Sequence, residues 1–448
     1  MKKLYFFIIL LMLGFSNLDA QIEDSKGKDF WLTYPPNFHR YKFDNDERRK
    51  YGDSLYLFIV ADVPTNGSIV YYDSTGREYT HNFSITNPAE VYTFKVSFFD
   101  FELVGFNDSG KPFKRNQCER VAKQSFHITS DNEIIVYGHS QAVTTSDALM
   151  VFPTDILGSD YLIMSYYGDV EMDDDYNGNK LKTPSQFAVV ATEDNTLVKI
   201  NPTVPTYANG YGLQEITLNK GEVYLVQATV TGGINESDLT GTSVQSSKPV
   251  AVFAGHQKAT VPLRVGNNNP SRDFLISQMP PVRTWGKNSF LTQFVSPSGI
   301  TNLGTDLYRI LAAYDSTEVF INGLKTVTLD KGGFYEGPLT EAAYITSNSP
   351  ILVAQFKKTS QSDSYLQRLG DPFFVVIPPK EQFMTSYKVM NTQAYQSNGF
   401  NYEKVYDEHY ITLVVPATAR NEINLDGTNV PSNSFTRISN SDYYYTNI

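Results

Sequence analysis

One acidic segment of the chain has the residue types and spacing of a metal site. Asp173, Asp175 and Asn177 alternate along the sequence and are followed by Gly178. This pattern forms the first half of a calcium loop, because Ca²⁺ takes hard oxygen ligands and the glycine permits a sharp turn. Pro184 stands where such a loop has its bidentate Glu. Two interpretations stay open: a solvated acidic loop, which the missing Glu favours, and a calcium site formed by Asp173, Asp175 and Asn177.

The other residues that could do chemistry form no recognisable catalytic motif. The sequence has neither a Gly-x-Ser-x-Gly elbow nor a phosphate-binding glycine loop. His139 and His256 each follow a glycine in similar segments, but the third such segment has Gln355-Phe356 in place of the Gly-His step, which predicts a structural role for both imidazoles. We therefore predict no catalytic residue and no cofactor, with calcium at Asp173, Asp175 and Asn177 as the alternative left open. A carboxylate pair that acts on polysaccharide stays an alternative, because such a pair is defined by its separation in space.

Composition narrows the class of protein further. The chain has 448 residues, a net charge of −11 and many Tyr and Phe residues, and it contains a single cysteine, Cys118. The net negative charge argues against a nucleic-acid partner, since the chain has no excess of basic residues to neutralise phosphates. One cysteine excludes a disulfide framework, so Cys118 is expected to be a free or buried thiol. The abundance of aromatic and β-branched residues favours strands.

The first 20 residues predict a secretory signal peptide. Two lysines precede the apolar run 4–15, and a small residue, Ala20, ends the segment. The run is short for a membrane anchor, and polar residues follow it at once. No later segment is apolar enough to span a membrane. We therefore expect a secreted or cell-surface protein without an integral membrane segment once the signal is removed; its oligomeric state is left open.

Three short sequence patterns, called phrases below, recur along the chain. The strands that they form must position any functional site. The first phrase is an Asp, an apolar strand and one or two prolines, seen at 147–153, 273–281 and 371–379, with a shorter copy at 29–36. The second, at 127–139, 244–256 and 344–356, has the pattern of a hairpin: a strand, a polar turn and an apolar strand. The third is a strand, a turn and a short strand, seen at 187–201, 310–323 and 411–427.

These repeats predict an all-β fold of tandem repeated β-sandwich-like units. The units are 21–146, 147–272, 273–370 and 371–448, and the last is expected to be incomplete because it lacks the second phrase. A β-propeller built from paired blades is the alternative, since both folds use the same short alternating strands. The recurrent Asp29, Asp147, Asp273 and Asp371 are interpreted as turn or cap residues, and Trp31 and Trp285 as core.

The segment 239–256, followed by Asp273, Gln278, Pro280-Pro281 and Trp285-Gly286, resembles the N-terminal domain of the IgGFc-binding protein family. The likeness extends from about Gly27 to the C-terminus and is most specific over 187–291. It implies an exported protein of the bacterial branch of that family with a binding or adhesive role outside the cell. Animal members place cysteines after the Gly-His step, whereas the stretch 258–270 has none here.

We therefore expect a non-enzymatic protein of the cell surface or the extracellular space. It would recognise a glycoprotein, a glycan or an envelope partner through loops held on rigid sheets, with tyrosines supplying contact area. The alternatives are a structural spacer within a larger surface protein and, third, an enzyme that acts on polysaccharide.

Overall fold

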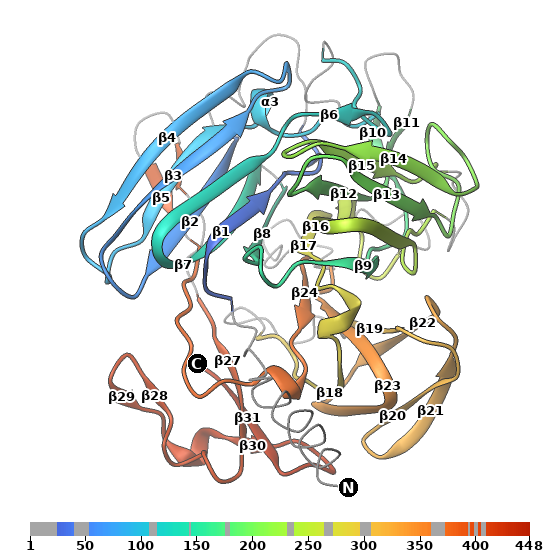
Figure 1. The fold of residues 1–448 in the computed structure, drawn as a ribbon. Helices are drawn as coiled ribbons and strands as arrows, with labels where there is room; N and C mark the ends of the chain where they lie inside the picture. The colour runs from blue at the N-terminus through green and yellow to red at the C-terminus, as the bar shows by residue number, and fades with distance from the viewer. Residues whose placement is uncertain are drawn as a thin grey trace, which may run out of the picture.

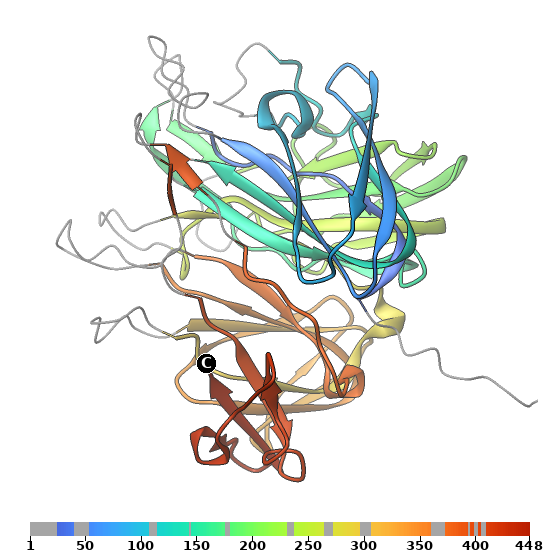
Figure 2. The same cartoon turned by 90° about the vertical axis from the view of Figure 1, so that its left-hand side faces the viewer.

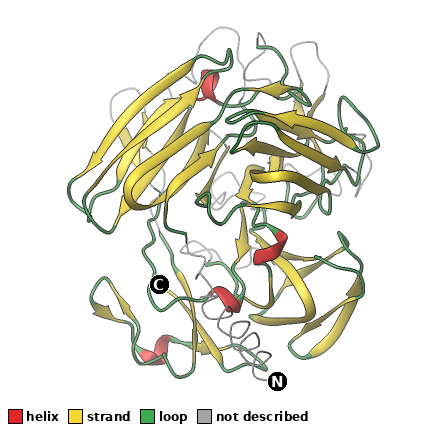
Figure 3. Ribbon diagram, viewed as in Figure 1, coloured by secondary structure: helices red, strands yellow, loops and turns green. Residues whose placement is uncertain are grey.

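The regular secondary structure of the described residues is almost entirely β-strand, as Figure 3 shows. The computed structural model describes residues 25–39, 53–106, 114–142, 145–174, 180–230, 237–263, 272–295, 306–359, 372–392, 395–397, 402–404 and 409–448. The predicted signal peptide lies outside these residues. Among the described residues, helices are limited to single turns: α3 (Phe98–Phe101), η1 (Val282–Thr284), η2 (Lys380–Gln382) and η3 (Ser432–Ser434). The prediction of an all-β fold of repeated sandwich-like units is confirmed.

Three antiparallel sheets of similar topology follow one another along the chain (Figure 1). The first sheet contains β1 (Gly27–Leu32), β2 (Ser54–Ala61), β3 (Thr65–Tyr72), β4 (Glu78–Ile85), β5 (Tyr92–Ser97), β7 (Phe126–Ala142) and β8 (Thr145–Val151). The second contains β6 (Val121–Ala122), β9 (Gly158–Leu162), β12 (Ser185–Ala191), β13 (Thr196–Asn201), β14 (Gln214–Leu218), β15 (Val223–Gln227), β16 (Ser243–Ala259) and β17 (Asp273–Gln278). The third contains β18 (Gly286–Leu291), β19 (Asp306–Ala312), β20 (Thr317–Ile321), β21 (Leu324–Leu329), β22 (Phe334–Leu339), β23 (Ala343–Phe356) and β24 (Phe374–Ile377).

The remaining strands are shorter. They are β10 (Asp169–Asp174) with β11 (Lys180–Thr183), β25 (Tyr395–Ser397) with β26 (Tyr402–Lys404), β28 (Asn424–Leu425) with β29 (Thr428–Asn429), and a sheet of β27 (Thr412–Pro416), β31 (Tyr443–Asn447) and β30 (Thr436–Arg437). In Figures 1 and 2 the C-terminal strands β27–β31 lie beside the third sheet. Tyr443 packs its ring on Phe290 of the third sheet, with centroids 4.4 Å apart.

A single long strand organises each sheet, which corrects the hairpins predicted at 127–139, 244–256 and 344–356. In the first sheet, the N-terminal half of β7 pairs with β1 and β3, and its C-terminal half pairs with β2 and β8. The polar residues near the middle are exposed, but the backbone stays extended because each half has its own partners. The strands β16 and β23 repeat this arrangement.

The interpretation of 29–36 as a copy of the Asp147 phrase is wrong. The strand β1 pairs with β7 as β9 pairs with β16 and β18 with β23, so Gly27 corresponds to Gly158 and Gly286. The backbones of these three glycines approach a proline of the next phrase so closely that an added Cβ would lie 2.3–2.7 Å from it; the prolines are Pro153, Pro281 and Pro379.

The strands that begin the Asp147 and Asp273 phrases, β8 and β17, each complete the preceding sheet, as does β24 after position 371. Apart from β6, which precedes β7 but pairs with β15 of the second sheet, the sheets therefore divide the chain after these strands rather than at 147, 273 and 371. The reason is that each closing strand pairs with the long strand just before it in the sequence.

The cores lie between successive sheets. Along β12, Ala188 and Val190 belong to the core shared with the first sheet, whereas Phe187 and Val189 belong to the core shared with the third. Side chains alternate between the faces of a strand, so the second sheet is buried on both faces. This explains why β12 is an uninterrupted apolar run, as in other sheets covered on both sides.

Candidate functional site

A turn between β13 and β14 presents the most exposed aromatic group of the second sheet. Tyr207, Tyr211 and Leu213 are 47%, 76% and 58% exposed. No charged residue occurs between Ile200 and Gln214, although the chain as a whole is strongly acidic. Depletion of charge and enrichment of tyrosine are the compositional features of the centre of a protein interface. We call residues 206–214 the tyrosine turn.

One buried carboxylate holds the tyrosine turn in place. Glu119, which precedes β6, accepts hydrogen bonds at Oε1 from Gln214 Nε2 at 2.7 Å, Asn209 Nδ2 at 3.1 Å and the hydroxyl of Thr206. Its Oε2 accepts from the backbone N–H groups of Ala208 and, at 3.1 Å, of Asn209. The lone pairs of the carboxylate are thus used on five donors, all in the turn.

The local sequence makes this geometry accessible. The backbones of Gly210 and Gly212 have φ values of +62° and +116°, where residues with a Cβ are strained. The N–H and carbonyl of Thr206 bond to Gly210 at 2.9 and 3.0 Å, which closes the turn. The rigid backbone therefore fixes the directions in which Tyr207 and Tyr211 leave the surface.

Two neighbouring elements support the base of the turn. The ring of Tyr207 stacks on Phe106, with centroids 4.0 Å apart and planes within 6°. The Tyr224 hydroxyl donates to Gln214 Oε1 at 3.1 Å. Burial, together with the nearby negative charge of Glu119, raises the pKa of Tyr224 to about 12, so this hydroxyl stays a donor at neutral pH.

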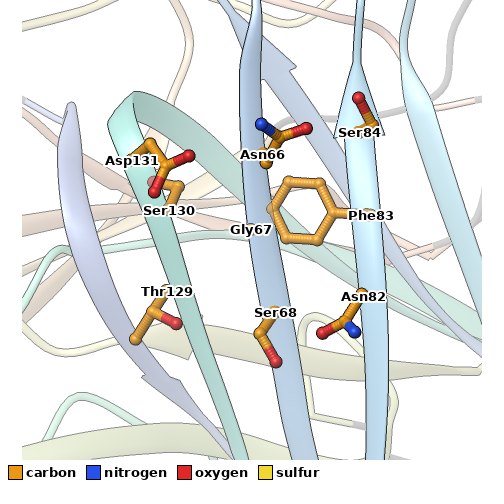
Figure 4. Close-up of a pocket in the computed structure, with 9 residues that line it drawn as sticks. All are labelled: Asn66, Gly67, Ser68, Asn82, Phe83, Ser84, Thr129, Ser130 and Asp131. Atoms are coloured by element: carbon orange, nitrogen blue, oxygen red, sulfur yellow. The ribbon is translucent and has the colours of Figure 1, made fainter.

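A second candidate surface is an open polar groove of about 740 Å³ on the first sheet (Figure 4). The strands β3, β4 and β7 line it side by side. Its lining contains amide and hydroxyl side chains and one carboxylate: Asn66, Ser68, Asn82, Ser84, Thr129, Ser130 and Asp131, with Gly67 and Phe83. A glycosidase needs two carboxylates across the bond it cleaves, and this groove supplies one.

A histidine and two carboxylates do meet beside the first sheet, in the segments that connect its strands, but they are buried. His39 lies 2.8 Å from Asp53 and 3.1 Å from Glu102, and its ring stacks on Phe98. Burial disfavours the charged imidazole, yet the two carboxylates outweigh it and raise the pKa of His39 to about 9. The group is a buried ion cluster without access for substrate, so it serves the fold.

The repeated histidines are structural, as the sequence predicts. The strand pairing shows that His139 and His256 are not at equivalent positions. The corresponding residues Gly27 and Gly158 pair with Ile134 and Val250, and the two histidines follow these partners by five and six residues. In the third repeat, Phe356 and Lys357 stand at the matching positions. Both imidazoles are fully buried, and burial lowers the pKa of His139 to about 4 and that of His256 to about 3. Both are therefore neutral near pH 7.

The repeated aspartates act between repeats rather than within a turn. Asp147 accepts from the backbone N–H of Ile276 at 2.9 Å, and Asp273 accepts from that of Ser146 at 2.6 Å. Each carboxylate also accepts from the residue that follows it. The closing strands β8 and β17 are thereby bound to one another. The interpretation that these residues belong to the architecture holds for both, while Asp371 lies outside the described residues.

Two of the three predicted calcium ligands lie outside the residues that the structure describes. Asp173 is part of the strand β10, and Asp175 and Asn177 lie outside the described residues. Within the described ranges, no three His, Cys, Asp or Glu side chains are grouped to hold a metal ion. Cys118 is a free, buried thiol whose pKa is raised by burial. In the same ranges, no helix has the length and apolarity needed to cross a membrane.

Sequence reasoning missed both candidate surfaces. The one available signal for the tyrosine turn was an uncharged, glycine-rich stretch with two tyrosines, 200–214. Glu119 carried no signal, because it is about 90 residues from its partners. The groove residues are ordinary outward-facing positions of three strands, and only the pairing of those strands brings them together.

Comparison with known proteins gives one family. The family model described as "IgGFc binding protein" matches residues 147–448, which is more than half of the chain. A human protein named IgGFc-binding protein is 24% identical over 319 residues, covering 68% of this chain. The matched region amounts to 5% of that human protein, so the chain corresponds to a small part of its length.

Proposed function

Since this chain belongs to the IgGFc-binding protein family, we propose that it is an extracellular binding protein that attaches to a glycoprotein partner through the tyrosine turn. The observation that carries the proposal is that Glu119 anchors the turn that bears Tyr207 and Tyr211, through hydrogen bonds to other residues of that turn. A turn that is rigid before binding loses little conformational entropy on association, and tyrosine is a frequent hot-spot residue. Adhesion at the cell surface, or after secretion, is the role that fits such a contact.

Two soluble probes follow from this proposal. The name of the human relative describes binding to the Fc part of IgG, so an Fc fragment is one probe. A mucin-type glycoprotein is the other. Each would be immobilised in its native form and after enzymatic removal of glycans, and binding of chain 21–448 would be measured by biolayer interferometry.

The decisive variant is Tyr211→Ala. Loss of a hot-spot tyrosine costs about 2 kcal/mol, which corresponds to about 30-fold weaker binding. Tyr314→Ala is the matched control, because Tyr314 is 52% exposed on a turn of the third sheet. Equal loss in both variants, or no loss in either, would exclude the tyrosine turn as the contact. Failure of the wild-type chain to bind either probe would reject these partners.

A spacer in a larger surface protein is the second candidate. It is favoured by the docking of successive sheets, in which Arg309 of the third sheet donates to Asp238 of the second at 2.8 Å and to the carbonyl of Ser165 at 2.7 Å. Such buried contacts make the relative positions of the sheets rigid. Small-angle scattering and force spectroscopy of the mature chain would identify a stiff module, with or without a ligand.

A further inference from the structure

The polar groove of the first sheet has the chemistry of a carbohydrate site. Its six outward side chains share one face, because residues that alternate along a strand, and residues directly opposite across strands, point the same way. Asn66 is opposite Ser84, and Ser68 is opposite both Asn82 and Thr129. Opposed side chains lie about 5 Å apart, which places amides and hydroxyls in a regular array.

These polar groups are available to a ligand. Within the part of the chain that the structure describes, none of the six outward side chains has a hydrogen-bond partner; they are Asn66, Ser68, Asn82, Ser84, Thr129 and Asp131. By contrast, the neighbouring Asp29 and His127 on the same sheet are bonded to each other at 2.8 Å. The groove therefore gathers unused hydrogen-bonding capacity.

The types of group in the groove define the ligand class. Each amide and each hydroxyl can both donate and accept, which matches the hydroxyls of a sugar, since these also do both. The lining includes one carboxylate, Asp131, and no lysine or arginine, so a sulfated or sialylated chain would meet a negative charge without a cation. The volume of about 740 Å³ falls within the range of about 300–1,000 Å³ typical of small-molecule sites.

From these observations we propose that the groove binds a neutral oligosaccharide. The inference rests on the proposed binding role and adds a glycan site that is separate from the tyrosine turn. A glycoprotein would then be held at two places, its polypeptide by the turn and its neutral sugar chain by the groove.

The test uses chain 21–448 and a panel of linear neutral oligosaccharides of glucose, mannose, galactose and N-acetylglucosamine, together with sialylated and sulfated chains. Array binding would select the best oligosaccharide for isothermal titration calorimetry. Asn82→Ala and Asn66→Ala should each weaken its binding about three- to tenfold, the effect of one lost hydrogen bond. Thr80→Ala is the matched control, since Thr80 is exposed on β4 outside the groove.

The outcomes separate this proposal from the proposed function. Weaker oligosaccharide binding in Asn82→Ala and Asn66→Ala, with unchanged binding in Thr80→Ala and Tyr211→Ala, supports the groove. Binding of no neutral oligosaccharide, equal binding by all variants, or binding of anionic chains alone would overturn it. A contact with an extended peptide at the edge strand β4 would appear as binding to a deglycosylated probe that Asn82→Ala weakens, which also overturns it. Thermal melting of each variant verifies that it is folded.

Discussion

Glu119→Gln is the sharpest test of how the tyrosine turn is held. Glutamine keeps the size of the side chain, but its amide places an N–H₂ group where one carboxylate oxygen stood. If the retained oxygen still accepts from Thr206 and Gln214, the amide nitrogen faces the N–H groups of Ala208 and Asn209. Two backbone donors then lose a charged acceptor.

The structure sets the size of the effect. A hydrogen bond to a charged group contributes about 1.5–3 kcal/mol, and the loss of two, partly offset by water, should cost about 2–4 kcal/mol. At 1.4 kcal/mol per factor of ten, the turn should open about 30 to 700 times more often. The global free energy of unfolding should change less, because the turn can open while the sheets stay packed.

Amide hydrogen exchange measures this opening directly. The amides of residues 206–214 should exchange faster in Glu119→Gln by the factor given above, while those of β12 should not change. Glu215→Gln is the control, because Glu215 forms only a half-exposed ion pair with Lys199 at 2.7 Å, and such pairs contribute little. Identical exchange of the turn in both variants would refute the anchoring role of Glu119.

Three further predictions follow. Arg309→Ala should destabilise the fold by about 3–5 kcal/mol in urea denaturation, because it leaves the buried Asp238 and the partly buried Glu336 without their cation. By contrast, Arg437→Ala, at an exposed ion pair, should change stability by less than about 1 kcal/mol. The pKa of His39 is raised to about 9 in the folded state, above its ordinary 6.5. The stability that the charged imidazole contributes is therefore complete below pH 6.5 and is lost as the pH rises through 9. If the melting temperature fell equally over this pH range in wild type and His39→Gln, this role of His39 would be contradicted. Calcium at the segment 173–177 stays a prediction: a melting temperature that rises on calcium titration, and does not in Asp173→Ala, would support the site, and an unchanged one would discard it.

Much of the fold could be predicted because its strands follow from patterns of apolar residues that are adjacent in the sequence. The apolar stretches 187–191 and 310–313 predict strands on composition alone, and β12 and β19 occupy them. A structural role for His139 and His256 could be predicted because the third similar segment has no histidine, and both side chains are buried. The error over the long strands arose because a polar interruption at 130–133 looks the same whether the chain reverses or merely bends between two sets of partners.

The candidate sites could not be predicted from the sequence, because they depend on contacts between residues far apart in the chain. Glu119 acts on residues about 90 positions away, and Asn66, Asn82 and Thr129 come together through strand pairing. The sequence by itself determined the all-β class, the repeats and the family, because periodicity and recurrent phrases are properties of neighbouring residues. Only the tertiary structure decided which side chains share a surface, since a carboxylate's role or a groove's lining is fixed by distances between segments that the linear order leaves free.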